Sequence, residues 1–386
     1  MIKKIQIKNF KSLAEISMSF EKFNCLIGMN GSGKSTVLQG LDFISQLMIG
    51  QVQDWLDNRG WSIHDLNCKL RKEGNILLAV RFELLDGQKL VWRGSFNRNL
   101  LRCTGENISL CGEKIFASNG TSFRIDSRSK QDITFVYQGS LLSVLKDSEL
   151  PAAILEFRDA MRRIRSLELL SPQLMRKSAR INDVDIGAGG EKLAGYLHGI
   201  KGEPRKKLAE LLKIFYPKIE DFKVTNQRAG WKKLSVIEQF EGHRLETEAT
   251  HLSDGLLRIL AILAQSGSDR SLILLDEIEN GINQEIIEKL VDTLIASPQQ
   301  ILVTTHSPLI LNFLDDNLAR KSVQFIYKSP QGESRIRRFF EIQRIGEKLN
   351  YMGPGDAFVD TDLEALTEEC IEFDRSEISP SLEEIE

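Results

Sequence analysis

Hydrophobic and polar positions in the first 50 residues alternate in two runs and then change to a helical spacing. Apolar side chains occupy every second or third position over residues 2–8 and 15–20, which is typical of half-buried β-strands. The mostly apolar run 23–27 predicts a buried strand, and the apolar positions from 36 to 47 predict a helix that begins near Lys34. The chain therefore opens with two antiparallel strands, a third strand and a helix.

The middle of the chain changes from strand to helix patterns and back. Short alternating runs between residues 76 and 137 predict an antiparallel β-rich flank, with turns at Asp86-Gly87 and Asn119-Gly120. The clearest of these runs are 78–83, 89–92, 96–103 and 133–137. Helical spacing then covers residues 141–212, apart from a flexible loop expected within 181–190, and strand patterns return at 219–225 and 234–240.

Two continuous apolar runs mark the C-terminal half. Residues 271–275 and 299–305 read as parallel strands buried on both faces, and the helical pattern at 283–296 joins them into a β-α-β unit. A short helix at 309–314 and a hairpin of residues 323–327 and 334–340 follow. These runs predict an α/β core.

The loop between the third strand and the first helix carries the strongest chemical signal. Residues 28–35 read Gly-Met-Asn-Gly-Ser-Gly-Lys-Ser, the G-x-x-x-x-G-K-[ST] spacing of a phosphate loop. Its glycines let backbone N–H groups point at phosphate oxygens, Lys34 is expected to reach the β- and γ-phosphates, and Ser35 to bind Mg²⁺. The expected nucleotide-binding residues of this loop are Asn30, Gly31, Ser32, Gly33, Lys34, Ser35 and Thr36.

Carboxylates follow the first of the two buried parallel strands. Asp276 and Glu277 end the run 271–275, at the strand end where ligands bind in open α/β sheets. Asp276 is expected to bind Mg²⁺ through water, and Glu277 to orient or deprotonate the water that attacks the γ-phosphate.

The start of the chain resembles a known group of ATPases. The segment Asn9-Phe10-Lys11-Ser12-Leu13, followed after about fifteen residues by Ile-Gly-Met-Asn-Gly-Ser-Gly-Lys-Ser-Thr, resembles the opening of RecF, SMC and OLD-type ATPases. The resemblance implies that Lys11 lies beside the nucleotide. Gln138, which follows the expected strand 133–137, resembles the Q-loop of ABC-type ATPases, whose amide reaches Mg²⁺ and the attacking water.

Three further motifs in the C-terminal half resemble the same group. Leu252-Ser253-Asp254-Gly255 resembles the LSGGQ signature, although Asp254 replaces a glycine, and the resemblance implies that Ser253 and Gly255 contact the γ-phosphate bound by the opposing subunit. Residues 276–282, Asp-Glu-Ile-Glu-Asn-Gly-Ile, resemble the OLD and RecF group more than transporter ATPases. His306 resembles the H-loop histidine, which contacts the γ-phosphate.

The resemblance implies an α/β P-loop NTPase fold: an ABC-type head with a mixed sheet, an antiparallel β flank and a helical insertion. Four segments are expected. They are an N-terminal ATPase lobe at 1–140, a mainly helical insertion at 141–245, a C-terminal ATPase lobe at 246–345 and an acidic tail at 346–386. The space from Gln138 to Leu252 is too short for long coiled-coil arms.

The implied function is an ATP-driven dimeric switch that uses ATP and Mg²⁺, in DNA maintenance or repair or in anti-phage defence. Its expected partners are a second copy of the chain, DNA, and a separately encoded effector such as a nuclease. The ATP-binding subunit of a membrane transporter is the alternative, and a pseudo-ATPase that only binds nucleotide is a third hypothesis. The Asp276-Glu277 pair argues against the third.

Composition and charge are those of an ordinary globular protein. Hydrophobic residues make up 41% and charged residues 27% of the chain, and its apolar runs are too short to span a bilayer. The five cysteines form no C-x-x-C pair, which indicates reduced thiols and a cytoplasmic protein.

The net charge of −3 hides an asymmetry between the two ends of the chain. Residues 355–386 carry −11, which leaves +8 on residues 1–354. We expect the acidic end to be solvated and partly disordered, and we expect Asp360 and Asp362 not to form a TOPRIM metal site, because no buried strand precedes them. The basic stretches within 162–207 are either the solvated face of helices or a nucleic-acid-facing lobe.

Overall fold

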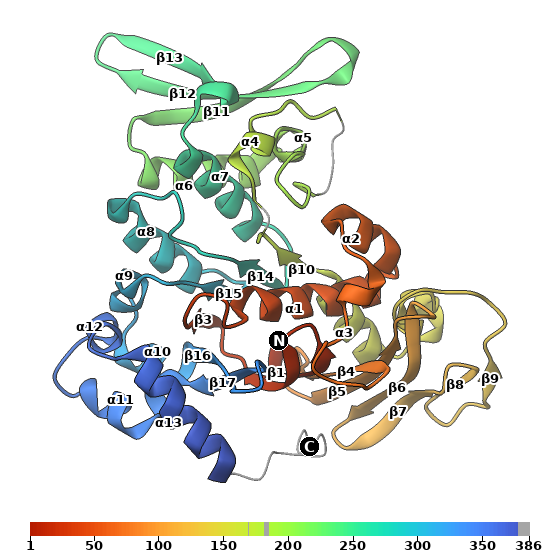
Figure 1. Cartoon of the computed structure of the whole chain (residues 1–386). Helices are drawn as coiled ribbons and strands as arrows, with labels where there is room; N and C mark the ends of the chain where they lie inside the picture. The colour runs from red at the N-terminus through yellow and green to blue at the C-terminus, as the bar shows by residue number, and fades with distance from the viewer. Residues whose placement is uncertain (169, 181–184, 377–386) are drawn as a thin grey trace. The chain divides into compact units, whose positions relative to one another are not determined.

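The computed structural model describes residues 1–168, 170–180 and 185–376 (Figure 1), and the chain forms two compact units. Unit 1 comprises Met1–Ile164 and Leu314–Glu386, and unit 2 comprises Arg165–Phe313. This division cuts across the four segments expected from the sequence, because unit 1 contains both ends of the chain. The loop expected at residues 185–190 is described, and these residues form neither helix nor strand.

An antiparallel sheet of eight strands makes up much of unit 1 (Figure 1), in the order β2-β1-β4-β5-β6-β7-β8-β9. Its strands are β1 (Ile2–Phe10), β2 (Leu13–Ser19), β4 (Asn75–Glu83), β5 (Lys89–Asn97), β6 (Arg102–Leu110), β7 (Glu113–Ser118), β8 (Ser122–Ile125) and β9 (Gln131–Asp132). The N-terminal strand pair is antiparallel, as predicted from its alternation.

Two of the strand predictions for this flank are wrong. Residues 96–103 are not one strand, because the chain turns between β5 and β6 and Leu101 adopts a positive φ of 52°. Residues 133–137 form no strand. Phe135 and Val136 are exposed there and Tyr137 alone is buried, so the alternating apolar pattern does not face the core.

The nucleotide loop of unit 1 is positioned by a second group of strands. β3 (Phe23–Ile27), buried along its whole length, pairs in parallel with β16 (Val323–Lys328), which pairs antiparallel with β17 (Ser334–Arg338). The predicted strand at 23–27 and the C-terminal hairpin are therefore confirmed. α1 (Lys34–Ile49) packs on the large sheet through Phe43, whose ring stacks on Phe10 and meets Phe96 edge-on.

Several shorter helices complete unit 1. They are α2 (Val52–Arg59), α3 (Ala152–Arg162), α10 (Asp316–Ser322), α11 (Gln343–Lys348), α12 (Pro354–Val359) and α13 (Leu363–Ser376). No helix among the described residues is both long and apolar enough to cross a lipid bilayer.

The expectation of a solvated, partly disordered acidic end was wrong for residues 354–376, which form α12 and α13. Leu366 and Cys370, one turn apart on α13, are fully buried. Asp374 of the same helix accepts hydrogen bonds from the Tyr327 hydroxyl and from Arg337 of β17. The acidic residues therefore include one that anchors the helix to the hairpin, and a count of charge alone did not reveal this. Residues 377–386 lie outside the described part of the chain.

Unit 2 contains the two buried parallel strands predicted from the sequence. β14 (Leu272–Leu275) pairs in parallel with β15 (Gln300–Thr304), and β10 (Ile164–Ser166) lies beside β14. α8 (Gln284–Ile295) connects the parallel pair, so the β-α-β unit is confirmed. α7 (Asp254–Ser266) precedes β14, and α9 (Pro308–Asn312) follows β15.

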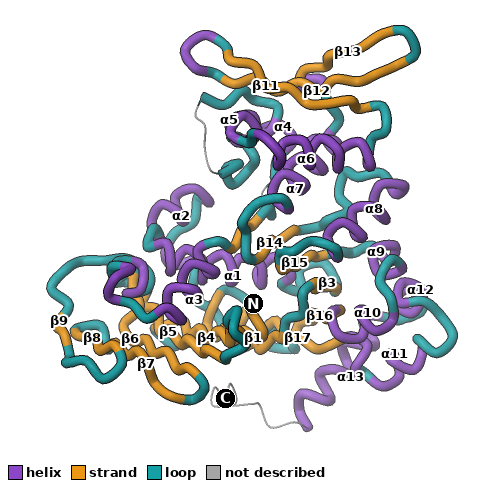
Figure 2. The backbone as a smooth tube through the Cα atoms, turned by 180° about the vertical axis from the view of Figure 1, so that it is seen from behind, coloured by secondary structure: helices purple, strands orange, loops and turns teal. Residues whose placement is uncertain are grey.

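A three-stranded antiparallel sheet lies at one end of unit 2 (Figure 2). It consists of β11 (Ile219–Asn226), β12 (Lys232–Phe240) and β13 (His243–Glu248). The helical pattern expected over 141–212 is only partly formed in this unit, as α4 (Pro172–Met175), α5 (Leu193–Gly199) and α6 (Gly202–Phe215). α5 and α6 pack against the sheet.

Candidate nucleotide-binding site

The phosphate loop of unit 1 is held against the β16–β17 hairpin at points where its glycines leave no room for a side chain. A Cβ atom on Gly28 would meet the Ile326 carbonyl oxygen at 2.2 Å, and one on Gly33 would meet Ser334 Oγ at 2.3 Å. Gly33 also has a φ of +114°, which glycine adopts without strain. By contrast, a Cβ on Gly31 would meet nothing within 4 Å, so this side of the loop is open.

The first turn of α1 has the features of an anion site. No side chain caps this helix, whose N-cap residue is Gly33. Uncapped N–H groups at a helix start, together with the helix dipole, favour a phosphate. Within the described part of the chain, the buried Ser32 Oγ has no hydrogen-bond partner. These observations fit the phosphates of a nucleotide.

Lys34 lies over the loop that it follows in sequence. Its Nζ donates hydrogen bonds to the carbonyl oxygens of Gly28, at 3.0 Å, and Met29, at 3.1 Å. Lys34 is buried. The ammonium group is therefore already directed into the loop, as a residue expected to bind phosphate oxygens requires.

Ser334 is a supporting residue that the sequence did not reveal. Its hydroxyl donates to the Ser32 carbonyl oxygen at 2.6 Å and lies 2.9 Å from Ser12 Oγ. Lys328 Nζ donates to Ser334 Oγ at 3.1 Å, and burial lowers the pKa of that ammonium. The hairpin thus fixes the loop through side chains far away in sequence, which only the folded chain shows.

Two residues expected beside the nucleotide have other contacts in the structure. Lys11 Nζ donates to Gln39 Oε1 of α1 at 3.0 Å and lies 2.9 Å from the centre of the Trp61 ring. Gln138 Oε1 accepts a hydrogen bond from the Gln53 N–H at the start of α2, at 3.0 Å. The nucleotide contacts of Lys11 and Gln138 stay predictions.

In unit 2, Asp276 and Glu277 lie where expected, at the carboxyl end of β14. Thr304, the last residue of β15, connects them: its hydroxyl donates to Asp276 Oδ1 at 2.5 Å and accepts the Glu277 N–H at 2.8 Å. Glu277 has a positive φ of 46°, which is uncommon for glutamate. The strand ends thus fix the Asp276 carboxylate and force the backbone of Glu277 into a turn.

His306 is brought next to Glu277. The His306 Nε2 atom lies 4.0 Å from Glu277 Oε1, and Asn280 Nδ2 donates to the other oxygen of Glu277 at 3.3 Å. The backbone N–H of His306 donates to Glu279 Oε1 at 2.8 Å, while Glu279 Oε2 is buried with no hydrogen-bond partner among the described residues. The Glu279 carboxylate therefore connects the segment after β14 to the segment after β15. The small cavity against Asp276 and Glu277, of about 10 Å³, has roughly the space of one water molecule.

Ser253 begins α7, and its Oγ accepts the Leu256 N–H at 3.3 Å. A Cβ on Gly255 would meet the Gly281 carbonyl oxygen at 2.6 Å, so α7 begins in close contact with the segment that follows Glu277. Arg176 donates to the Leu252 carbonyl oxygen at 2.8 Å and to Asp254 Oδ1 at 2.5 Å. This arginine belongs to the basic stretches within 162–207, but no local pattern links it to the signature motif.

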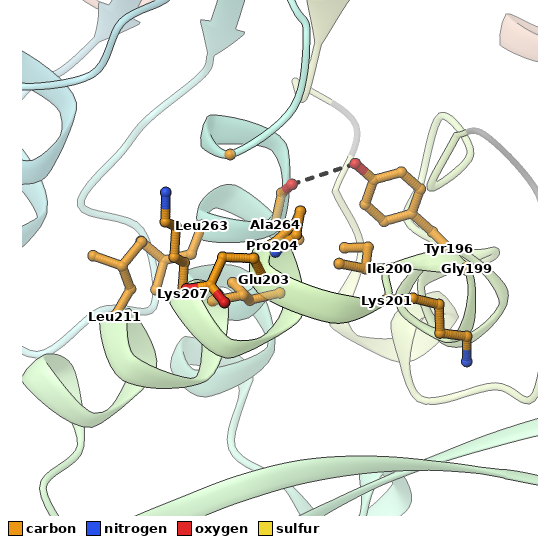
Figure 3. A pocket seen from close by; sticks show the side chains of 12 residues that line it. Tyr196, Gly199, Ile200, Lys201, Glu203, Pro204, Lys207, Leu211, Leu263 and Ala264 are labelled. Carbon is orange, nitrogen blue, oxygen red and sulfur yellow. Dashed lines mark hydrogen bonds between the residues drawn. The ribbon is translucent and has the colours of Figure 1, made fainter.

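Two other features lie outside the motif residues. Burial raises the pKa of Glu106 in β6 to about 7, although the Ser140 hydroxyl, the Leu141 N–H and the Trp92 indole all donate to its carboxylate. A cavity of about 500 Å³ lies beside α5, α6 and α7 (Figure 3). No predicted site residue lines this cavity, which is mainly apolar with Lys201, Glu203 and Lys207 at its edge.

A family model described as "AAA domain, putative AbiEii toxin, Type IV TA system" matches residues 23–88 and 138–312, more than half of the chain. Among curated proteins, an OLD nuclease of Thermus scotoductus is 31% identical over 109 residues, which are 28% of this chain and 19% of that protein. The chain thus matches about a fifth of the length of this relative.

Solved structures of Smc head domains share the fold. One Smc head bound to the C-terminal winged-helix domain of ScpA has a TM-score of 0.56 at 16% identity, covering 87% of this chain and 96% of that chain. A second, an Smc head with an extended coiled coil bound to the C-terminal domain of ScpA derived from Pyrococcus furiosus, has a TM-score of 0.54 at 14% identity, covering 90% and 99%. The chain belongs to the matched AAA domain family, and its fold is that of the ABC-type Smc head domains.

Proposed function

We propose that this protein binds and hydrolyses ATP and uses the cycle to switch a dimer between open and closed forms. The observation that carries the proposal is the arrangement of Asp276, Glu277 and His306 at the carboxyl ends of two parallel strands. A carboxylate fixed by Thr304 and a second carboxylate beside an imidazole are the groups that phosphoryl transfer to water requires.

Each residue has one role in this proposal. The loop residues Asn30, Gly31, Ser32, Gly33 and Thr36, with Lys34, bind the ATP phosphates. Ser35 and Asp276 would hold Mg²⁺, which would neutralise phosphate charge. Gln138 is a further candidate ligand of Mg²⁺, and Lys11 is a further candidate contact of the nucleotide. Glu277 positions and deprotonates water, and His306 donates to the γ-phosphate. The positive φ of Glu277 supports this role, because strained backbone is concentrated at functional sites.

Dimerisation completes the site in the proposal. Ser253 and Gly255 of one subunit contact the γ-phosphate that Lys34 of the other subunit binds. The support is the position of Ser253 at the start of α7, where backbone N–H groups lie close together. ATP then joins the two subunits, and hydrolysis separates them.

The biological role that we propose is DNA maintenance or anti-phage defence in the cytoplasm, together with a separately encoded effector such as a nuclease. The match to a protein named OLD nuclease supports this role, although it covers only 19% of that protein.

The proposal is tested with Glu277→Gln, which keeps the size and hydrogen bonding of the side chain but removes the base. We expect the turnover number to fall by about a hundredfold or more, the usual contribution of a general base. ATP affinity should be retained, and light scattering in ATP should give twice the mass of one chain.

The matched control is Glu285→Gln, which neutralises an exposed carboxylate on α8 and should hydrolyse ATP like the natural protein. Normal hydrolysis by Glu277→Gln would remove this residue from the base role and with it the proposed chemistry.

A further inference from the structure

A short segment of unit 2, residues 176–180 (Arg-Lys-Ser-Ala-Arg), is tied at both ends to functional elements. We call it the basic strap. At one end Arg176 donates to Leu252 and Asp254 at the start of α7. At the other end Ala179 exchanges two backbone hydrogen bonds with Lys232, of 3.1 and 2.6 Å. The strap therefore connects the signature motif to the turn that leads into β12.

Three cations along this connection are exposed and unpaired. Lys177 and Arg180 of the strap and Arg228 of the turn form no ion pair or hydrogen bond through their side chains within the described ranges. Other cations nearby are satisfied by neighbours, since Lys233 pairs with Glu248 and Arg176 with Asp254. The unpaired charges thus favour an anionic partner from outside the chain.

An exposed aromatic ring lies next to these cations. Trp231 is 42% exposed, and the antiparallel bridge between Ala179 and Lys232 places position 231 opposite Arg180. Ala229, with a positive φ of 59°, turns the chain between Arg228 and Trp231. The exposed indole and the three cations therefore belong to one short stretch of surface.

An aromatic ring beside unpaired cations fits the chemistry of single-stranded nucleic acid. Phosphates bind the cations, and an unstacked base stacks on the ring. A duplex has no unstacked base to offer, and an acidic peptide has no base. Unit 2 has a second group of exposed lysines, at positions 201, 207 and 213. Lys201 precedes α6 and the other two lie on it, and this helix also carries Glu203 and Glu210, which lower its net positive charge.

We propose that the basic strap and the 226–231 turn bind single-stranded DNA. This binding changes the position of the signature motif through Arg176, and ATP hydrolysis is thereby stimulated. The coupling rests on the ATPase proposed above, whereas the binding does not. The physical basis of the coupling is that the five residues of the strap carry two unpaired cations and also the arginine that bonds to Leu252 and Asp254.

Binding is tested with a fluorescein-labelled oligothymidylate of twenty nucleotides and fluorescence anisotropy. Three phosphate contacts predict a slope of about −2 for the logarithm of the association constant against that of the salt concentration. The triple variant Lys177→Gln, Arg180→Gln, Arg228→Gln should lose most of this slope and more than about tenfold in affinity. Trp231→Ala should lose about tenfold, and Trp231→Phe should retain most of the affinity.

The matched control removes the same charge elsewhere, with Lys201→Gln, Lys207→Gln and Lys213→Gln, and should bind the oligonucleotide like the natural protein. An equal loss in this control would overturn the proposal, as would an unchanged affinity of Trp231→Ala. Absence of oligonucleotide binding, or equal competition by polyglutamate, would also overturn it and indicate a different occupant.

Coupling is tested by measuring ATP hydrolysis with and without the same oligonucleotide. The natural protein should be stimulated about fivefold or more, the lower range of an ordinary coupling free energy. Arg176→Gln should bind the oligonucleotide but lose the stimulation, and Arg176→Lys should restore part of it. Stimulation that survives in Arg176→Gln would overturn the coupling.

The two proposals fail in different ways. If the natural protein hydrolyses ATP but neither binds nor responds to the oligonucleotide, this inference fails and the ATPase stands. If it binds the oligonucleotide through the strap but never hydrolyses ATP, the ATPase fails and the binding surface stands.

Discussion

Two helices of this chain begin with motifs expected to contact the same phosphate, yet the two helix starts are built differently. α1 in unit 1 follows Gly33 and has no side-chain cap. α7 in unit 2 is capped by Ser253, and Arg176 binds Asp254 in its first turn. A capped helix start is worth about 1 kcal/mol, so α1 lacks a stabilisation that α7 has.

Of the two helix starts, only that of α1 is free of a side-chain cap. At α1 no side chain caps the helix start, so a phosphate can bind its N–H groups without displacing a cap. At α7, Ser253 must exchange its contact with Leu256 for one with a phosphate. This is consistent with the proposal that α1 binds ATP first and that α7 of the opposing subunit joins it on closure.

Breaking the α1 side of the comparison should have the larger effect. In Gly33→Ala, the added methyl group meets Ser334 and the backbone stays at a strained positive φ. We expect the free energy of unfolding to fall by about 3 kcal/mol and ATP affinity to fall with it, measured by denaturant unfolding and by nucleotide titration.

Gly31→Ala is the matched control, because its φ of +74° is also positive but no atom lies within 4 Å of the added group. It should cost only about 1 kcal/mol. Equal losses in the two variants would show that the contact with the hairpin does not position the loop.

Changing the α7 side should have a smaller effect on stability and a different effect on function. Ser253→Ala should lower the free energy of unfolding by about 1 kcal/mol, the value of one N-cap. ATP affinity should be unchanged while hydrolysis falls, as measured by titration and phosphate release. Ser171→Ala, at an N-cap without a side-chain cap hydrogen bond, should leave the free energy of unfolding and the hydrolysis rate nearly unchanged. A loss of ATP affinity in Ser253→Ala would show that both helix starts take part in the initial binding of ATP, which contradicts the proposed order.

The sequence predicted the two motif regions well because their signals are local. The strand, loop and helix around residues 23–49 follow from one apolar run and a glycine-rich spacing. The parallel pair β14–β15 follows from two continuous apolar runs, and these bring Asp276, Glu277 and His306 to one edge.

The supporting contacts could not be predicted because they join residues far apart in the chain. Ser334 donates to the Ser32 carbonyl oxygen, 302 positions away in the sequence, and Arg176 donates to Asp254, 78 positions away. Such pairs depend on tertiary packing, for which a single sequence has no periodic signal. Gln138 shows the converse case: a plausible motif residue whose side chain contacts Gln53 in the structure.

The acidic end shows how composition misleads. Its charge predicted a solvated tail, whereas Leu366 and Cys370 give α13 a buried stripe and Asp374 pairs with Arg337. These buried side chains and the ion pair dock a helix of which six of the twelve other positions are charged.

If each ATP site is built from two subunits, mixing two variants that are inactive alone should restore hydrolysis. Lys34→Ala cannot bind the phosphates of its own ATP, and Ser253→Arg blocks the site of its partner. At equal concentrations half of the dimers are mixed and each holds one intact site, so about a quarter of the natural hydrolysis rate should return. No recovery, although tagged subunits co-purify as mixed dimers, would contradict the shared site.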